Sequence, residues 1–317
     1  MDKEQEIINH YLKPLAKNKE SLNLENDAAY LKNKNLVITT DMMIEDQHFK
    51  KELCPKLIAR KLLRINLSDL AAMGAEPYGF LLNIAIPKNL TDEWLSNFTK
   101  GLKQDMTFFN LKLFGGDLSY SSKIFLNATI LGKTRKLCHS KNYANLNSHI
   151  FVSGNLGDAS LGFVVNNKPS SIYSPNSSEY LMKKLMIPNP RLEIGKKLVG
   201  KVEFCTDISD GLIRELLLVA NNSKMKANIF LDKIPISSIT KKILKNNKNK
   251  KKQIWEYILS GGEDYELLFG VGKNKIKLIK NIRDISKIGF FSEGKGLNIF
   301  DKDGKKINFK KKGFSHF

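Results

Sequence analysis

Hydrophobic residues recur at helical spacing in two segments of the first half of the chain. Between residues 55 and 73, apolar residues fall at positions 57/58, 62, 65 and 70, which predicts a helix that ends at Gly74. A second stripe over residues 94–109 predicts another helix, and Thr91 has the side chain to cap it.

Short apolar and β-branched runs lie between and after these helices. In the first half they predict strands at 36–40, 79–86, 111–114 and 124–131, with a turn at Gly115-Gly116-Asp117 between the last two. A new strand–turn–helix unit begins at Ile150. Beyond it we expect helices after Pro190 and over 211–222, strands at 202–206, 227–231 and 264–270, and a hairpin turn at Asp303-Gly304.

Strands and helices are interspersed along the whole chain, which predicts an α/β (α+β) architecture with two domains. The polar, irregular stretch over 133–149 marks the boundary. We therefore divide the chain into residues 1–140 and 141–317.

No apolar run reaches the length of a membrane span, and the N-terminus carries acidic residues where a signal peptide would carry basic ones. Three cysteines, Cys54, Cys138 and Cys205, cannot all pair, and no C-x-x-C is present. These features predict a protein of the reducing cytoplasm with no membrane partner.

The formal net charge of +20 raises the question of nucleic-acid binding. The lysines, however, are spread along the chain, and the densest run, over 241–252, contains no aromatic residue on which a base could stack. We expect solvated lysines and no nucleic-acid partner. A milder alternative is that the positive field attracts anionic nucleotides.

Common nucleotide-binding motifs are absent. Gly132-Lys133-Thr134 resembles the end of a P-loop, but Asn127 stands where that loop needs glycine, and the segment before it has the pattern of a strand. Nucleotide binding, if present, therefore needs another arrangement.

Aspartates recur beside glycine, serine or threonine, and we place several of them at strand ends or helix starts. Six stand out: Asp27, Asp41, Asp69, Asp117, Asp207 and Asp210. Brought together, they would repel one another unless divalent cations held them, and magnesium combines carboxylates with the phosphate oxygens of a substrate. This chemistry suits phosphoryl transfer.

Each aspartate also has a plainer interpretation. Asp210 or Ser209 can cap the following helix, Asp41 and Asp117 can be turn residues, Asp69 can lie on a solvent-facing stripe, and Asp27 can be a surface residue.

Taken together, the segments resemble the thiamine-monophosphate kinase family, a branch of the superfamily that includes aminoimidazole-ribonucleotide synthetase and selenophosphate synthetase. The resemblance covers essentially the whole chain. It rests on seven segments in order: Asn26–Ala29, Thr39–Asp41 with Glu45–Phe49, Asn66–Pro77 (NLSDLAAMGAEP), Gly115–Asp117, Asp207–Gly211, Ser260–Leu267 (SGGEDYEL) and Gly313–Phe317.

The resemblance implies a role for each matching residue. The metal ligands would be Asp27, Thr40, Asp41, Asp69, Asp117, Asp207 and Asp210. The ATP contacts would be Thr39, Gly116, Asp117, Lys141 and Ser209. The substrate contacts would be His48, Glu263 and Phe314. No catalytic residue beyond the metal ligands is implied.

The resemblance also implies that each domain holds a mixed sheet packed with helices, with the site in a cleft between them. The reaction would be direct in-line transfer of the ATP γ-phosphoryl group to thiamine monophosphate, with several magnesium ions and no phosphoenzyme. A homodimer formed through the N-terminal domains is expected, and a potassium requirement stays open.

The chain departs from the family pattern at several positions. Asn26 replaces an acid, and Asp46 replaces a glycine. Lys141 falls where the family has a nucleotide-binding arginine. It would act as a point charge there, unless it is a solvated linker lysine and Arg135 is the basic partner. Lys311 replaces an aromatic residue, whose role Phe314 or Phe309 would take.

Two rival functions follow. Another ATP-using enzyme of the same superfamily fits most of the motifs. A basic nucleic-acid-binding protein without catalysis fits the charge, and it would bind with a steep salt dependence.

Overall fold

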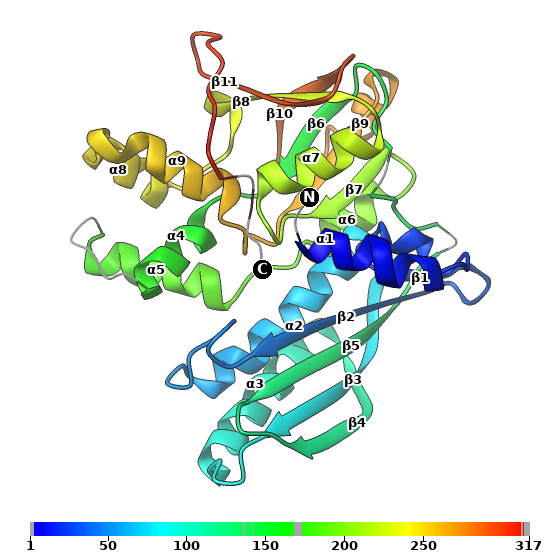
Figure 1. The fold of residues 1–317 in the computed structure, drawn as a ribbon, viewed down its shortest axis with the longest axis vertical. Helices are drawn as coiled ribbons and strands as arrows, with labels where there is room; N and C mark the ends of the chain where they lie inside the picture. The colour runs from blue at the N-terminus through cyan, green and yellow to red at the C-terminus, as the bar shows by residue number, and fades with distance from the viewer. Residues whose placement is uncertain (1–2, 136, 142, 168–172, 312, 314–317) are drawn as a thin grey trace.

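Two β-sheets, one from each half of the chain, form the frame of the computed structural model (Figure 1). The structure describes residues 3–135, 137–141, 143–167, 173–311 and 313. The first sheet has the order β1-β2-β5-β3-β4 and the second β11-β8-β10-β6-β9-β7. Both combine parallel and antiparallel pairs, and helices pack on both. The predicted α/β class with two mixed sheets is therefore confirmed.

The strands are β1 Ala29–Leu31, β2 Leu36–Ile44, β3 Glu76–Ile86, β4 Lys112–Tyr120, β5 Phe125–Lys133, β6 His149–Ser153, β7 Phe204–Asp207, β8 Lys226–Phe230, β9 Leu267–Val271, β10 Ile285–Ser292 and β11 Gly296–Phe300. The α-helices are α1 Lys3–Ile7, α2 Pro55–Ala72, α3 Asp92–Phe109, α4 Asp158–Asn167, α5 Pro175–Met186, α6 Leu192–Leu198, α7 Leu212–Asn222, α8 Ser238–Asn246 and α9 Lys251–Ser260.

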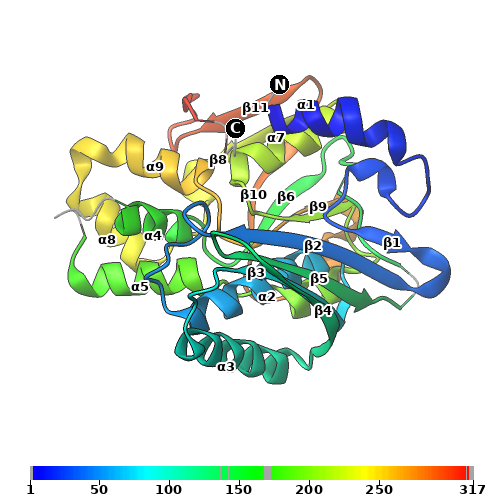
Figure 2. The same ribbon diagram turned by 60° about the horizontal axis from the view of Figure 1, so that its bottom comes forward.

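Helix α2 contributes to the cores of both sheets. Ile58 and Leu62 pack in the core beneath the first sheet, whereas Ala71 and Ala72 pack in a core that includes Phe269 of the second sheet. Helix α3 packs along the outer side of α2 (Figure 2). The two halves therefore share α2 as a common element.

The predicted helix ends are largely as observed. Gly74, with φ +70°, follows the end of α2, and the Thr91 hydroxyl accepts a hydrogen bond from the amide of Trp94. The capping interpretation of Ser209 and Asp210 is wrong. The cap residue of α7 is Gly211, with φ +105°, and no side-chain capping hydrogen bond forms there among the described residues.

Two aspartates predicted at strand ends lie inside strands. Strand β2 continues three residues beyond Asp41, and β4 runs through Gly115-Gly116-Asp117, so the predicted turn is wrong. The glycines serve close packing instead. A Cβ on Gly116 would lie 1.8 Å from the carbonyl oxygen of Leu82 on β3.

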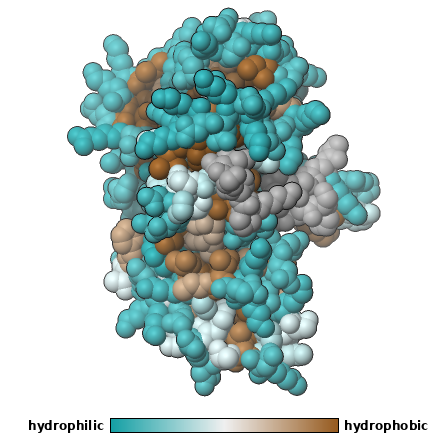
Figure 3. All heavy atoms as spheres, turned by 90° about the vertical axis from the view of Figure 1, so that its left-hand side faces the viewer, coloured by the Kyte–Doolittle hydropathy of each residue, from teal (hydrophilic) through white to brown (hydrophobic). Residues whose placement is uncertain are grey.

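The surface agrees with the solvated-lysine interpretation, because every lysine of the 241–252 run is exposed. On the face in Figure 3, hydrophilic side chains cover most of the surface, and apolar ones gather at the waist between the two halves. Among the described residues, no helix has the length and apolar character needed to cross a membrane.

A buried charge cluster joins α2 to α3. Asp105 is fully buried and accepts hydrogen bonds from Arg60 and Arg64, while Arg64 also donates to the carbonyl of Pro188 in the second half. Removing the carboxylate leaves two cations without their partner in a low-dielectric environment.

We expect Asp105→Ala to lower the free energy of unfolding by about 3–5 kcal/mol, the usual cost of breaking a buried pair from one side. Urea unfolding measures this loss. Gln104→Ala, at an exposed neighbouring position of α3, is the control. Equal stabilities of the two variants would contradict the assignment.

Candidate active site

An acidic pocket of about 230 Å³ lies where the two halves meet. Seven of the residues predicted from the sequence line it: Asp41, His48, Asp69, Asp207, Ser209, Asp210 and Glu263. The first three come from β2, the loop after it and α2, and the other four from the second half. The fold therefore brings together residues that lie far apart in the sequence.

Asp41 and Asp69 face each other between β2 and α2. The amide of Asp41 donates to the Asn66 side chain at 2.9 Å, and the Thr39 hydroxyl donates to Asp69. Burial, together with Asp210 and Asp27, raises the pKa of Asp41 to about 6. Burial and Asp41 raise the pKa of Asp69 well above its usual value, so the solvent-stripe interpretation of Asp69 is wrong.

Asp207, at the end of β7, links the second sheet to α2. Its carboxylate accepts a hydrogen bond of 2.7 Å from Ser68, the neighbour of Asp69 on α2. Burial and the charge of Asp27 raise the Asp207 pKa well above its usual value. The Ser68 bond thus places this carboxylate beside those of the first half.

Asp210 lies at the mouth of the pocket. The Nε of Arg214 is 3.5 Å from its carboxylate, and the same guanidinium binds Glu4 of α1 at 3.0 Å. Helix α1 lies beside the junction of the two halves (Figure 1). The N-terminal helix is therefore part of the pocket wall, which the sequence motifs did not indicate.

Asp27 is held by a lysine. The Nζ of Lys141 lies 2.8 Å from Asp27 and 3.0 Å from Glu215, and the Thr206 hydroxyl donates to Asp27. Burial by itself would lower the pKa of Lys141, but Asp27 and Glu215 raise it well above its usual value. Asp27 is thus no surface residue, and Lys141 is no solvated linker lysine.

Glu215 is the buried residue that our sequence interpretation missed. It lies in the first turn of α7, where Arg214 is the other charged residue of an apolar run, and only 2% of its side chain is exposed. An acid within an apolar helical pattern is the signal that singled out Asp69. Applied to α7, it would have found Glu215.

The donor set fits magnesium. The Oδ2 atom of Asp27 is buried and has no hydrogen-bond partner, and the charge of Asp27 adds to burial in raising the pKa of Asp207. Within the described ranges, no three acidic, histidine or cysteine side chains converge on one metal position. Magnesium needs no such cage, because it binds one or two carboxylates and completes its shell with water and phosphate oxygens.

Glu263 and His48 define the other side of the pocket. Gly262 and Glu263 both have positive φ, and a Cβ on Gly262 would lie 2.3 Å from the Ser209 carbonyl oxygen. Lys61 of α2 forms an ion pair of 2.6 Å with Glu263. The Nδ1 of His48 accepts from the amide of Ile44 at 3.0 Å, which orients the ring.

Some predicted residues lie elsewhere in the single chain. Thr40 is exposed and bonds Thr129 and Asn127, on the sheet face opposite Thr39. Asp117 and Gly116 lie on β4, three strands from β2, or about 14 Å at the usual strand spacing. Phe314 lies outside the described residues.

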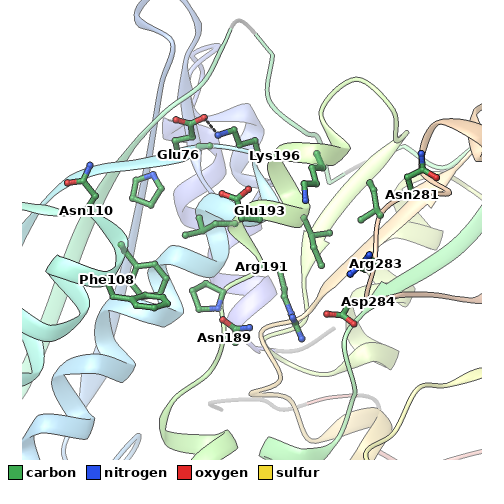
Figure 4. Close-up of a pocket in the computed structure, with 18 residues that line it drawn as sticks. Glu76, Phe108, Asn110, Asn189, Arg191, Glu193, Lys196, Asn281, Arg283 and Asp284 are labelled. Carbon is green, nitrogen blue, oxygen red and sulfur yellow. Dashed lines mark ion pairs between the residues drawn. The ribbon is translucent and has the colours of Figure 1, made fainter.

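A larger cavity, of about 790 Å³, also borders both halves but contains no predicted residue (Figure 4). Glu76 and Lys196 pair across it at 2.6 Å. Arg135, the alternative basic partner, also pairs with Glu76 and is largely exposed. Of the two candidate cations, Lys141 is the one in contact with the aspartates.

The chain is similar in sequence to known proteins. Residues 25–134 match the family model described as AIR synthase related protein, N-terminal domain. The chain is 36% identical to the thiamine-monophosphate kinase of Buchnera aphidicola subsp. Acyrthosiphon pisum (strain APS), with 98% of each chain covered. It is 32% identical to that of Aquifex aeolicus (strain VF5), over 90% of this chain and 89% of the relative.

Solved structures give the same picture. The structure described as AaThiL complexed with AMPPCP and TMP superposes with a TM-score of 0.85 at 30% identity, covering 99% of this chain and 98% of that one. A HypE–HypF complex, at 16% identity and a TM-score of 0.72, shares the fold. Fold and site thus define a protein of the AIR synthase-related class. Within that class, the chain belongs to the thiamine-monophosphate kinase family.

The raised pKa of Asp41 predicts a pH dependence of stability. Below about pH 6 the folded protein keeps a proton that an ordinary carboxyl group, with a pKa of 3.8, would have released. The metal-free protein should therefore be more stable at pH 5 than at pH 7.5, with stability falling as pH rises through about 6.

Thermal unfolding in EDTA across this pH range measures the effect. Asp41→Asn should reduce the slope, because the substitution removes one of the titrating groups. If the melting temperature of the variant fell as steeply with pH as that of the wild type, groups other than Asp41 would cause the pH dependence.

Proposed function

We propose that this chain uses ATP to phosphorylate thiamine monophosphate to thiamine diphosphate, by direct transfer of the γ-phosphoryl group. The observation that carries the proposal is the pocket at the junction of the two halves, where the buried Asp207 lies beside the half-buried Asp41 and Asp69. Family membership supports it, as does the similarity to a structure that holds AMPPCP and TMP.

We propose magnesium as the cofactor, held by Asp27, Asp41, Asp69, Asp207 and Asp210. When bound, it would neutralise the phosphate oxygens during transfer. The chain's own groups then bind and orient. We assign Lys141 and Ser209 to the ATP side, because Ser209 lines the pocket and Lys141 pairs with the proposed magnesium ligand Asp27, and we assign the pocket residues His48 and Glu263 to the acceptor side. The acceptor phosphate is already anionic, so no strong general base is needed.

We propose that the active form is a homodimer in which a second copy covers the exposed face of the first sheet. That face carries apolar side chains in the open, with Met42 51% and Leu81 41% exposed. β1 pairs with only residues 36–38 of β2, and β4 is exposed along its whole length. Pairing of such faces would bury surface that is costly to leave in water.

The dimer would also complete the site. Asp117 is too distant from Asp41 to share a ligand within one chain, whereas β4 of a second copy could approach the outer edge of β2. We therefore propose that the partner's Asp117 and Gly116 act beside Thr40 and Asp41.

We also propose a cytoplasmic location and a division into two domains. The Cys54, Cys138 and Cys205 thiols are unpaired, which supports a reducing, cytoplasmic setting. The proposed boundary at residues 140/141 lies between the last strand of the first sheet and the first strand of the second. This position supports a division into two domains.

The decisive assay incubates the purified protein with ATP, magnesium and thiamine monophosphate, with and without potassium, and measures thiamine diphosphate. Asp210→Asn should reduce turnover by more than a hundredfold, because losing a metal ligand costs several kcal/mol of transition-state stabilisation. Thermal unfolding checks that the variant is folded. Turnover within about threefold of wild type at saturating magnesium would remove Asp210 from the site.

His48→Ala should raise the KM for thiamine monophosphate at least tenfold and leave the KM for ATP within about twofold, since His48 lines the acceptor side. Steady-state kinetics with each substrate varied in turn measures the two constants. If the KM for ATP changes more, His48 belongs to the nucleotide side.

Mixing two inactive variants tests the shared site. Asp41→Asn and Asp117→Asn are each expected to be inactive, but refolding them together should restore about a quarter of wild-type activity, because half of the dimers would be mixed and each would hold one intact site. Recovery of no activity, with mixed dimers present by mass spectrometry, would place both residues in the same chain's site.

A further inference from the structure

Lys141 is fixed in place at both its backbone and its side chain. Its amide donates to the side chain of Asn26 at 2.7 Å, and its ammonium group bridges Asp27 and Glu215. The exposed fraction of the Lys141 side chain is 17%, against 5% for Asp27 and 2% for Glu215. The lysine thus enters a space closed to most solvent, where each charge needs a partner.

The charges in this space do not balance without the lysine. Asp27 and Glu215 are both buried, and Asp207 adds a third carboxylate nearby. Among the described residues, Lys141 is the only cation that forms an ion pair with Asp27 or Glu215. Removing it would leave two buried carboxylates uncompensated.

We propose that Lys141 and Glu215 form a built-in counter-ion pair for Asp27, and that the Lys141 ammonium competes with magnesium for the charge of the Asp27 carboxylate. This inference rests on the proposed function only in assigning magnesium to Asp27. Glu215 becomes a positioning residue, which holds the ammonium beside the site whether or not metal is bound.

The two oxygens of Asp27 explain how competition and binding coexist. Oδ1 accepts from Lys141 and from Thr206, whereas Oδ2 is buried without a hydrogen-bond partner. A cation approaching Oδ2 meets a carboxylate whose charge is already partly neutralised, and it is repelled by the ammonium. Asn26 strengthens this effect, because an amide stands beside Asp27 where a second acid would attract metal.

The test measures magnesium binding to the nucleotide-free protein. Isothermal titration with MgCl2 should give a dissociation constant about tenfold lower for Lys141→Met than for wild type, the size of one charged contact. In EDTA the same variant should unfold at a lower temperature than wild type, and magnesium should recover more of its stability. Lys100→Met, at an exposed position on α3, controls for the change in net charge.

A second variant tests the inference if Lys141→Met alone fails to fold. Lys141→Met/Glu215→Gln removes one charge of each sign, so it should fold with near wild-type stability in EDTA and still bind magnesium more tightly. Magnesium affinity equal to or weaker than wild type in this folded double variant would overturn the inference. The thiamine diphosphate assay on the wild-type protein decides the proposed function separately.

Discussion

The constraint on which the rest of this structure depends is the cost of burying several carboxylates side by side. Asp207 is buried beside the half-buried Asp41 and Asp69, and burial together with Asp41 and Asp207 raises the pKa of Asp69, an arrangement that destabilises a protein without cations. The fold tolerates it through specific donors: the Ser68 hydroxyl on Asp207 and the Thr39 hydroxyl on Asp69. The acidic pocket thus lowers the stability of the metal-free protein, because its carboxylates are placed for binding cations.

Much of the site could be predicted from the sequence, because its residues lie in local patterns with a clear physical meaning. The aspartate within NLSDLAAMG is an acidic residue in an apolar helix, and Asp207 and Asp210 flank a strand-to-helix turn. What could not be predicted depends on neighbours distant in sequence. From the sequence alone, the double glycine of β4 suggests a turn. In the structure, Gly116 is explained by the close approach of Leu82 on β3.

The same limit applies to the positions of Asp117 and Lys141. Sequence order gives no indication that β4 lies three strands from β2, so six matching aspartates suggested a single cluster. Nor does it distinguish a lysine in a polar stretch from one that enters a buried acidic pocket. The chain has 52 lysines and arginines, so composition does not identify the few that form ion pairs in the site, such as Lys61 and Lys141.

The shared position of α2 has a consequence during protein synthesis. Its last residues, Ala71 and Ala72, pack in a core with Leu198 of α6 and Cys205 of β7, so these partners leave the ribosome about 130 residues later. At usual rates of translation this interval is roughly 6–26 s. During that time the nascent chain exposes one apolar end of a helix that is otherwise complete. Protection by a chaperone, or a delay in the final packing of the first half, follows from this order of synthesis.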